Sequence, residues 1–155
     1  MVTLQPMSDN DFKDYIERLI PDYARDKVEA GNWSEEEALE RSRTECEGLL
    51  PQGPGTPGNH LFNLTNDANQ KIGVLWYAAN KNTGHPAFIY DFEIFEPFRR
   101  RGYARQALAQ LDEDAKKRGF KKLELHVFGH NMAARELYKT SGFTESNVIM
   151  TKSLD

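Results

Sequence analysis

Cysteine is nearly absent from this sequence, because Cys46 is the only one among 155 residues. A single cysteine excludes an intramolecular disulfide, and with it the class of small secreted domains that disulfides hold together. Long apolar runs are also missing, so no segment is expected to span a membrane. Residues 1–12 lack the basic and apolar regions of a secretory signal. These features together predict a cytoplasmic protein.

Two glycine-rich nucleotide-binding motifs are missing as well. The sequence has no G-x-G-x-x-G after a predicted strand and no G-x-x-x-x-G-K-[ST], so a Rossmann or P-loop nucleotide site lacks its motif. Residues 51–59, PQGPGTPGN, are rich in glycine. Their prolines remove N–H donors, however, and we predict a plain loop there.

What the sequence does contain is enough apolar material for one domain, which we expect to span residues 1–155. Its hydrophobic residues make up 39% of the chain and its aromatic residues 11%, which favours a folded core over disorder. The net charge is -4, yet residues 99–122 hold nine basic and three acidic residues. A local positive field on an acidic protein suggests that an anionic partner binds at one place.

Apolar periodicity predicts an α/β fold in the order ααβββαβαβ. We expect helices at 9–30, kinked or split at Pro21, and at 35–49, then strands at 60–65, 72–78 and 87–95. A helix at 102–119, a strand at 122–128, a helix at 131–142 and a final strand at 148–150 follow. Strict alternation in the 87–95 strand would place Phe88, Tyr90, Phe92 and Ile94 on one face.

The segment FRRRGYARQAL, residues 98–108, lies between a predicted strand and a predicted helix. The first N–H groups of a helix have no backbone acceptor, and the helix dipole adds positive potential there. Gly102 would let an anion approach the backbone, and the arginines would attract it. The segment therefore predicts a phosphate or pyrophosphate site, the alternative being an exposed basic helix start.

Two segments resemble one family. Arg99 to Ala104 is similar to the [Q/R]-x-x-G-x-[G/A] pyrophosphate loop of the GCN5-related N-acetyltransferase (GNAT) family, and HNMAARELYKTSGF, residues 130–143, is similar to its N-x-x-A-x-x-L-Y-x-x-x-G-F segment. The resemblance is sharp from about residue 70 to 150 and diffuse over the first 60 residues, where family members bind different acceptors. It implies a mixed, mostly antiparallel sheet flanked by helices, with a splayed parallel strand pair that holds acetyl-CoA.

The resemblance also implies which residues contact that cosubstrate. The pantetheine arm would pair with the backbone of Phe92, Glu93 and Ile94, and Asn131 would hydrogen-bond the cofactor as well as cap its helix. Residues 61–155 would form the acetyl-CoA-binding core, and residues 1–60 the acceptor side. The pyrophosphate would lie on the N–H groups and side chains of the loop residues Arg99, Arg100, Arg101, Gly102, Tyr103, Ala104 and Arg105.

Tyr138 matches the family's catalytic tyrosine, and it would protonate the departing CoA thiolate. The general base is open between His126, Glu93, Asp91 and an ordered water, with His126 placed where some members carry a catalytic glutamate. His126 and His130 could suggest a metal site, but no third ligand is evident, and we predict no metal.

The function predicted is acetyl transfer from acetyl-CoA to an unidentified amine by direct attack in a ternary complex. The alternative is a module of the same fold that senses acyl-CoA without turnover. A nucleic-acid binder is disfavoured by the pI of about 5.6 and by the few aromatic residues among the basic ones. Because members of the family are often dimers, a homodimer is a further expectation.

Overall fold

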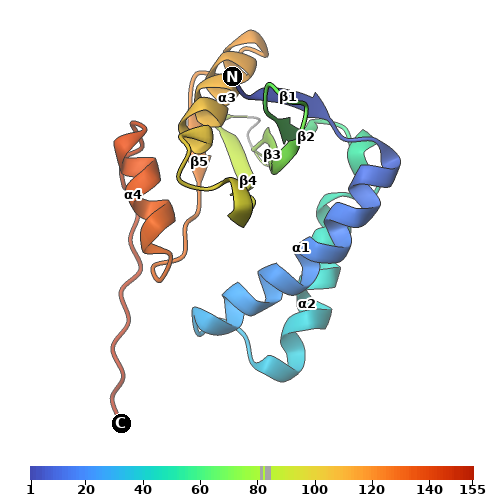
Figure 1. Cartoon of the computed structure of the whole chain (residues 1–155). Helices are drawn as coiled ribbons and strands as arrows, with labels where there is room; N and C mark the ends of the chain where they lie inside the picture. Colours follow the sequence, from blue (N-terminus) through green and yellow to red (C-terminus); the bar gives the residue numbers. More distant parts are fainter. Residues whose placement is uncertain (81, 83–84) are drawn as a thin grey trace.

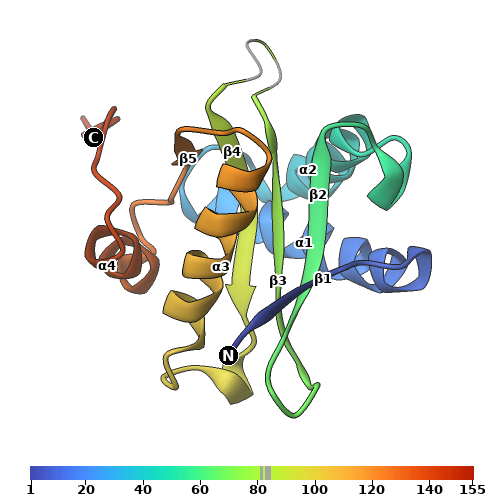
Figure 2. The same ribbon diagram turned by 90° about the horizontal axis from the view of Figure 1, so that it is seen from above.

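The computed structural model describes residues 1–80, 82 and 85–155, and these residues form a sheet of five strands with helices on both faces (Figures 1 and 2). The elements are β1 (Thr3–Pro6), α1 (Asp9–Glu29), α2 (Glu35–Leu49), η1 (Gly53–Gly55), β2 (Asn59–Thr65), β3 (Lys71–Ala79), β4 (Ala87–Ile94), η2 (Glu96–Phe98), α3 (Tyr103–Lys117), β5 (Leu123–Leu125) and α4 (Met132–Thr140). The strands lie in the order β1-β2-β3-β4-β5, and only β4 and β5 are parallel. The predicted mixed, mostly antiparallel sheet is confirmed.

The helices begin where polar side chains satisfy their first N–H groups. The Ser8 hydroxyl accepts from the Asp11 N–H, and the Asp11 carboxylate accepts from the Ser8 N–H, each at 3.1 Å. Ser34 caps α2 and Asn131 caps α4 in the same way, through their side-chain oxygens. Such caps each stabilise a helix by about 1 kcal/mol. None of the described helices is long and apolar enough to cross a membrane.

Of the kink or split predicted at Pro21, the split is wrong, because α1 runs through Pro21 as one helix of 21 residues. Proline cannot donate to the carbonyl of Glu17, which costs a hydrogen bond. The apolar side of α1 offsets this loss, since Tyr15, Ile20 and Ala24 are buried.

The order of elements differs from the expected one at both ends of the chain. β1 precedes α1 and pairs with β2 from Thr3↔Thr65 to Pro6↔Phe62. Its four residues carry no alternating pattern, so a distant partner specifies this strand. At the other end, residues 144–155 form no strand, and the strand predicted at 148–150 is absent from this chain.

α3 covers one face of the sheet, and α1 and α2 cover the other (Figure 2). Each face has its own core. On the α3 face, Leu75 and Tyr77 of β3 pack with Leu108 and Leu111 of α3. On the α1 face, Val74 and Trp76 of β3 pack with buried residues of α1 and the loop after α2. β3 is buried on both sides because it lies at the centre of these layers.

β4 contains one residue more than β3 requires. Trp76 pairs with Asp91 and Tyr77 pairs with Ile89, which leaves Tyr90 as a bulge between them. The strict alternation predicted for this strand is therefore wrong: Ile89 faces α3 together with Phe92 and Ile94, whereas Tyr90 stacks on Trp76 with ring centroids 4.5 Å apart. Tyr90 and Asp91 thus both face α1.

β3 and β4 approach closely at Gly73, where a Cβ would lie 2.1 Å from the Glu93 carbonyl oxygen. We expect Gly73→Ala to lower the free energy of unfolding by roughly 1–3 kcal/mol, because the strand backbones must separate. Gly48→Ala is the matched control, since nothing lies within 4 Å of that Cβ position in α2. It should stabilise the helix by about 0.5–1 kcal/mol. Urea denaturation measures both, and a neutral Gly73→Ala would show that the close approach does not exist in solution.

Candidate active site

The site lies where β4 and β5 separate. Their parallel pairing covers only Ala87↔Leu123, Phe88↔Glu124 and Ile89↔Leu125, so the rest of β4 has no ladder partner on that side. A cavity of about 610 Å³ occupies the space between α1, β4, the residues after β5, and α4. The backbone edge of β4 is therefore open to a ligand where the ladder ends.

Several of the predicted site residues line this cavity, namely Phe92, Glu93, Arg99, His126, Asn131 and Tyr138. Ile94 is buried in the sheet core, and residues 100–105 lie beyond the cavity wall, at the start of α3. Prediction from sequence missed the contribution of α1, whose Tyr15, Arg18, Asp22 and Asp26 also line the cavity. Their spacing of three or four residues is the signal that could have shown them on one helix face.

The loop before α3 presents backbone N–H groups without acceptors. Gly102 stands at the N-cap position with φ +80°, Arg100 also has a positive φ of 64°, and no side chain caps the helix. The first α3 N–H with an acceptor is that of Gln106, bonded to the Gly102 carbonyl. Among the described residues the N–H groups of 100–105 have none, an arrangement that suits an anion.

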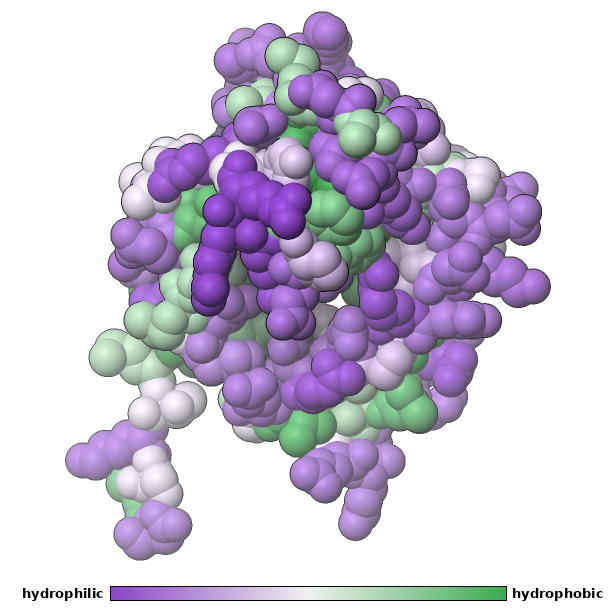
Figure 3. Space-filling model, in the orientation of Figure 1, coloured by the Kyte–Doolittle hydropathy of each residue, from purple (hydrophilic) through white to green (hydrophobic). Residues whose placement is uncertain are grey.

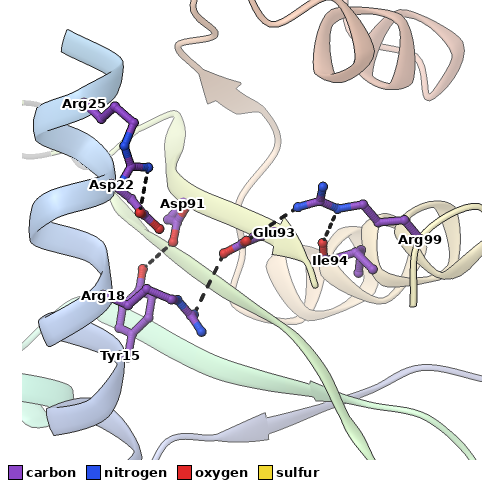
Figure 4. Close-up of polar contacts among 8 residues, drawn as sticks. All are labelled: Tyr15, Arg18, Asp22, Arg25, Asp91, Glu93, Ile94 and Arg99. Carbon is purple, nitrogen blue, oxygen red and sulfur yellow. Dashed lines mark hydrogen bonds and ion pairs between the residues drawn. The ribbon is translucent and has the colours of Figure 1, made fainter. Parts of the chain in front are cut away.

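The arginines of this loop have different partners. Arg99 donates through Nε to the Ile94 carbonyl at 2.8 Å, and its Nη2 lies 3.7 Å from Glu93 (Figure 4). Arg105 donates to the hydroxyl and carbonyl oxygens of Thr140, at 2.8 and 3.3 Å. Arg99 therefore fixes the loop to the end of β4, and Arg105 connects it to the end of α4.

Asp91 is a partly buried carboxylate in the cavity wall. The hydroxyl of buried Tyr15 donates to it at 2.7 Å (Figure 4). Burial raises the pKa of Asp91 to about 6, with the Tyr15 hydrogen bond and the charge of Arg18 opposing that rise. This carboxyl group can therefore exchange a proton near neutral pH.

Glu93 lies two residues further along the same face. Its carboxylate oxygens are 3.9 Å from Arg18 and 3.7 Å from Arg99. Burial raises its pKa, and the two arginines oppose that rise. Glu93 is thus a carboxylate held between α1 and the loop before α3.

Tyr138 and His126 approach the cavity from the opposite side. Burial raises the pKa of Tyr138 to about 12, and the charge of Asp91 adds to the rise. The phenol is therefore protonated at neutral pH and can donate a proton or a hydrogen bond. His126 is exposed, and partial desolvation together with the charge of Lys27 lowers its pKa.

His130 joins the loop before α4 to the end of α1. Its Nε2 lies 3.7 Å from Asp26 and 3.5 Å from Glu29. The three residues offer ligand atoms within 4.8 Å of one another, a spacing that could hold a metal ion. His126 is not part of this group, so the His126–His130 pair considered as a metal site in the sequence does not form it.

Comparisons with known proteins agree with the fold. The model of the acetyltransferase (GNAT) family matches residues 16–143. The chain is 44% identical to the uncharacterized N-acetyltransferase YycN of Bacillus subtilis over 99% of both chains, and the crystal structure of YycN superposes with a TM-score of 0.93. It is 37% identical to the uncharacterized N-acetyltransferase YdgE of the same organism over 98% of both chains.

A structure that contains a ligand is also similar. An acetyltransferase from Bacillus anthracis str. Ames, solved in complex with acetyl coenzyme A, is 25% identical over 60% of this chain and 52% of its own, with a TM-score of 0.54. With the family model and the two Bacillus subtilis relatives, these matches show that the chain belongs to the GNAT acetyltransferase family.

Gly102 provides a sharp test of the loop. We expect Gly102→Val to abolish measurable CoA binding in calorimetry, because the branched side chain would occupy the space above the uncapped N–H groups and strain a backbone at φ +80°. Gly58→Val is the matched control, since Gly58 has φ +77° and, like Gly102, open space at its Cβ position. Both variants should lose about 1–2 kcal/mol of stability, and normal CoA affinity in Gly102→Val would place the anion elsewhere.

Proposed function

We propose that this chain transfers an acetyl group from acetyl-CoA to an amine by direct attack in a ternary complex. The observation that carries the proposal is the cavity at the end of the β4–β5 ladder. Its wall contains the open edge of β4, the Asp91 carboxylate with its raised pKa, and the protonated phenol of Tyr138. An experiment with millimolar acetyl-CoA and a panel of amines, read by release of free thiol, tests it directly.

The cosubstrate would enter from the side of α3. Its pyrophosphate would bind the N–H groups of 100–105, and its pantetheine arm would pair with the backbone of Phe92, Glu93 and Ile94 beyond the β5 pairing. Asn131 accepts from the Ala134 N–H through its side-chain oxygen, which leaves its NH₂ group to donate to the cofactor. Residues 61–155 would thus form the cofactor core, and α1 and α2 the acceptor side.

Two proton transfers complete the reaction. The amine nitrogen attacks the thioester carbonyl carbon and loses a proton, while the C–S bond breaks and the sulfur gains one, giving an amide and free CoA. Tyr138 would protonate the sulfur. For the base we favour Asp91 over His126, because Tyr15 holds the Asp91 carboxylate in place and its raised pKa of about 6 makes it a stronger proton acceptor than an ordinary carboxylate.

The pH profile distinguishes the two bases. With Asp91 as the base, kcat/KM should fall as pH drops through about 6. Asp91→Asn should remove this acidic limb and slow turnover by ~10²–10⁴-fold. Tyr15→Phe deletes a hydrogen bond that lowers the Asp91 pKa. The acidic limb of the kcat/KM profile should therefore move to higher pH. The phenylalanine ring keeps the packing of the tyrosine ring. His126→Gln should leave the limb in place, whereas a profile that responds to His126→Gln alone would make His126 the base.

Tyr138→Phe distinguishes turnover from binding. The variant keeps the ring that packs edge-to-face on Phe143, with centroids 5.5 Å apart, so CoA affinity in calorimetry should stay nearly unchanged. We expect kcat to fall by about 10²-fold, the low end for a general acid, because a thiolate with a pKa near 8.5 is already a good leaving group. Full activity would remove the acid assignment, and lost CoA binding would make Tyr138 a cofactor contact.

The alternative is a module of the same fold that binds acyl-CoA as a sensor. It predicts tight CoA binding with no thiol release for any amine tested. The proton-transfer groups favour the enzyme, since a sensor needs neither a phenol nor a carboxylate of raised pKa in the same cavity.

A further inference from the structure

A histidine on the loop before α4 meets two carboxylates on the last turn of α1. The Nε2 atom of His130 lies 3.7 Å from Asp26 and 3.5 Å from Glu29, and one ligand atom from each of the three residues fits within 4.8 Å. In Figure 1 the end of α1 and this loop lie side by side. The cluster connects two walls of the cavity, because Asp26 lines it from α1 and Asn131, which follows His130, lines it from the start of α4.

The spacing of these atoms suits a bound ion better than hydrogen bonds. N–H···O bonds in proteins are about 2.7–3.2 Å long, and both carboxylates lie beyond that range from the imidazole nitrogen. Around a tetrahedral Zn²⁺ with bonds of about 2.0–2.2 Å, neighbouring ligand atoms lie roughly 3.4 Å apart. The observed distances of 3.5 and 3.7 Å are close to this value. An ion between the three side chains would therefore require only small side-chain movements.

The two carboxylates also lie where a helix disfavours negative charge. Asp26 and Glu29 are in the last turn of α1, next to the negative end of the helix dipole. The basic residue of that turn, Lys27, places its Nζ over the rings of Tyr23 and Trp33, at 5.7 and 5.4 Å from their centroids. Among the described residues, the two carboxylates form ion pairs with the histidine alone. A cation at this helix end would therefore be stabilising.

The imidazole is held in place within its own loop. His130 stacks on Phe128, with ring centroids 5.4 Å apart and planes at 17°. The Asn131 N–H donates to the Phe128 carbonyl at 3.0 Å, and Arg135 donates to the Gly129 carbonyl at 3.3 Å. A positioned imidazole beside two carboxylates is a ligand set that divalent transition metals accept.

The cluster is also accessible from water. The side chains of Asp26 and Glu29 are 48% and 59% exposed. Figure 3, drawn in the orientation of Figure 1, shows mainly hydrophilic side chains over this face of the molecule. An ion can therefore enter from solvent, and three protein ligands leave a coordination position for water.

We propose that Asp26, Glu29 and His130 bind a divalent transition-metal ion such as Zn²⁺. Each residue would supply one ligand atom, and water would complete the coordination. The ion would join the end of α1 to the loop before α4 and so fix two cavity walls relative to each other. The sequence predicted no metal because His126 and His130 lacked a third ligand. The fold supplies two carboxylate ligands to His130 from a distant part of the chain.

Calorimetry with Zn²⁺ tests the proposal on the full chain, after treatment with EDTA and desalting. At about pH 7.5 most histidine side chains are neutral and can bind a metal. One Zn²⁺ per chain should bind at micromolar concentration, and the midpoint of thermal unfolding should rise with the Zn²⁺ concentration. A parent chain without such binding would overturn the proposal, whatever its acetyltransferase activity.

Variants identify the ligands. His130→Gln and Glu29→Gln should each weaken Zn²⁺ binding by at least ~10-fold, since even residues that only orient a metal ligand contribute 10–100-fold. Glu36→Gln is the matched control for Glu29→Gln, because it removes the same charge from an exposed helix position, and His126→Gln is the matched control for His130→Gln. Both controls should keep the parent affinity. Binding that persists in His130→Gln, or that is lost in His126→Gln, would show that the ion lies elsewhere.

NMR with Co²⁺ locates the ion without a substitution. Paramagnetic Co²⁺ should strongly shift or broaden the imidazole signals of His130. The signals of His60 should stay nearly unchanged, because β2 lies three strands away from β5 in the sheet. Equal broadening of all four histidines would indicate adventitious binding and contradict the proposal.

Discussion

Tyr90 is an additional residue in β4, and the position of the groups in the cavity follows from it. Without the bulge, Asp91 would take the opposite face of the sheet and lie in the α3 core. With it, Asp91 and Glu93 face α1, and Tyr15 meets Asp91 at 2.7 Å. A bulge also bends its strand and increases the local twist. The pairing of β4 with β5 stops just before this point, at Ile89↔Leu125.

The electrostatics of the cavity combine the burial of one carboxylate, Asp91, with two weak ion pairs of Glu93. Removing Asp91 from water raises its pKa, and its charge in turn contributes to the raised pKa of Tyr138. The ion pairs of Arg18 and Arg99 with Glu93 are long and partly exposed, and pairs of this kind contribute little to stability. Their main effect is to join α1, β4 and the loop before α3 at one carboxylate.

The features predictable from sequence are those that a short stretch determines by itself. The loop at 99–104 and the segment at 131–143 have local signals, since a glycine with positive φ and an N-cap asparagine act within one turn. β1 was missed because Thr65 and its neighbours, some 60 residues away in the sequence, specify it. The bulge at Tyr90 was missed because apolar residues on both sides of it hide the change of face. The cavity side of α1 was missed because its polar residues resemble an ordinary solvated face.

The separation of the two cores has a consequence for how this protein can change. Arg18 and Asp22 line the cavity from α1 yet keep 39% and 42% of their side-chain surface exposed, and substitutions at such positions usually alter stability by less than about 0.5 kcal/mol. The α3 face, which carries the loop of 99–105, does not depend on them for packing. Amino-acid substitutions along α1 could therefore change the α1 wall of the cavity, while the loop of 99–105 on the α3 face keeps its structure. Tyr15 is the exception, because it is both part of the α1-side core and the partner of Asp91.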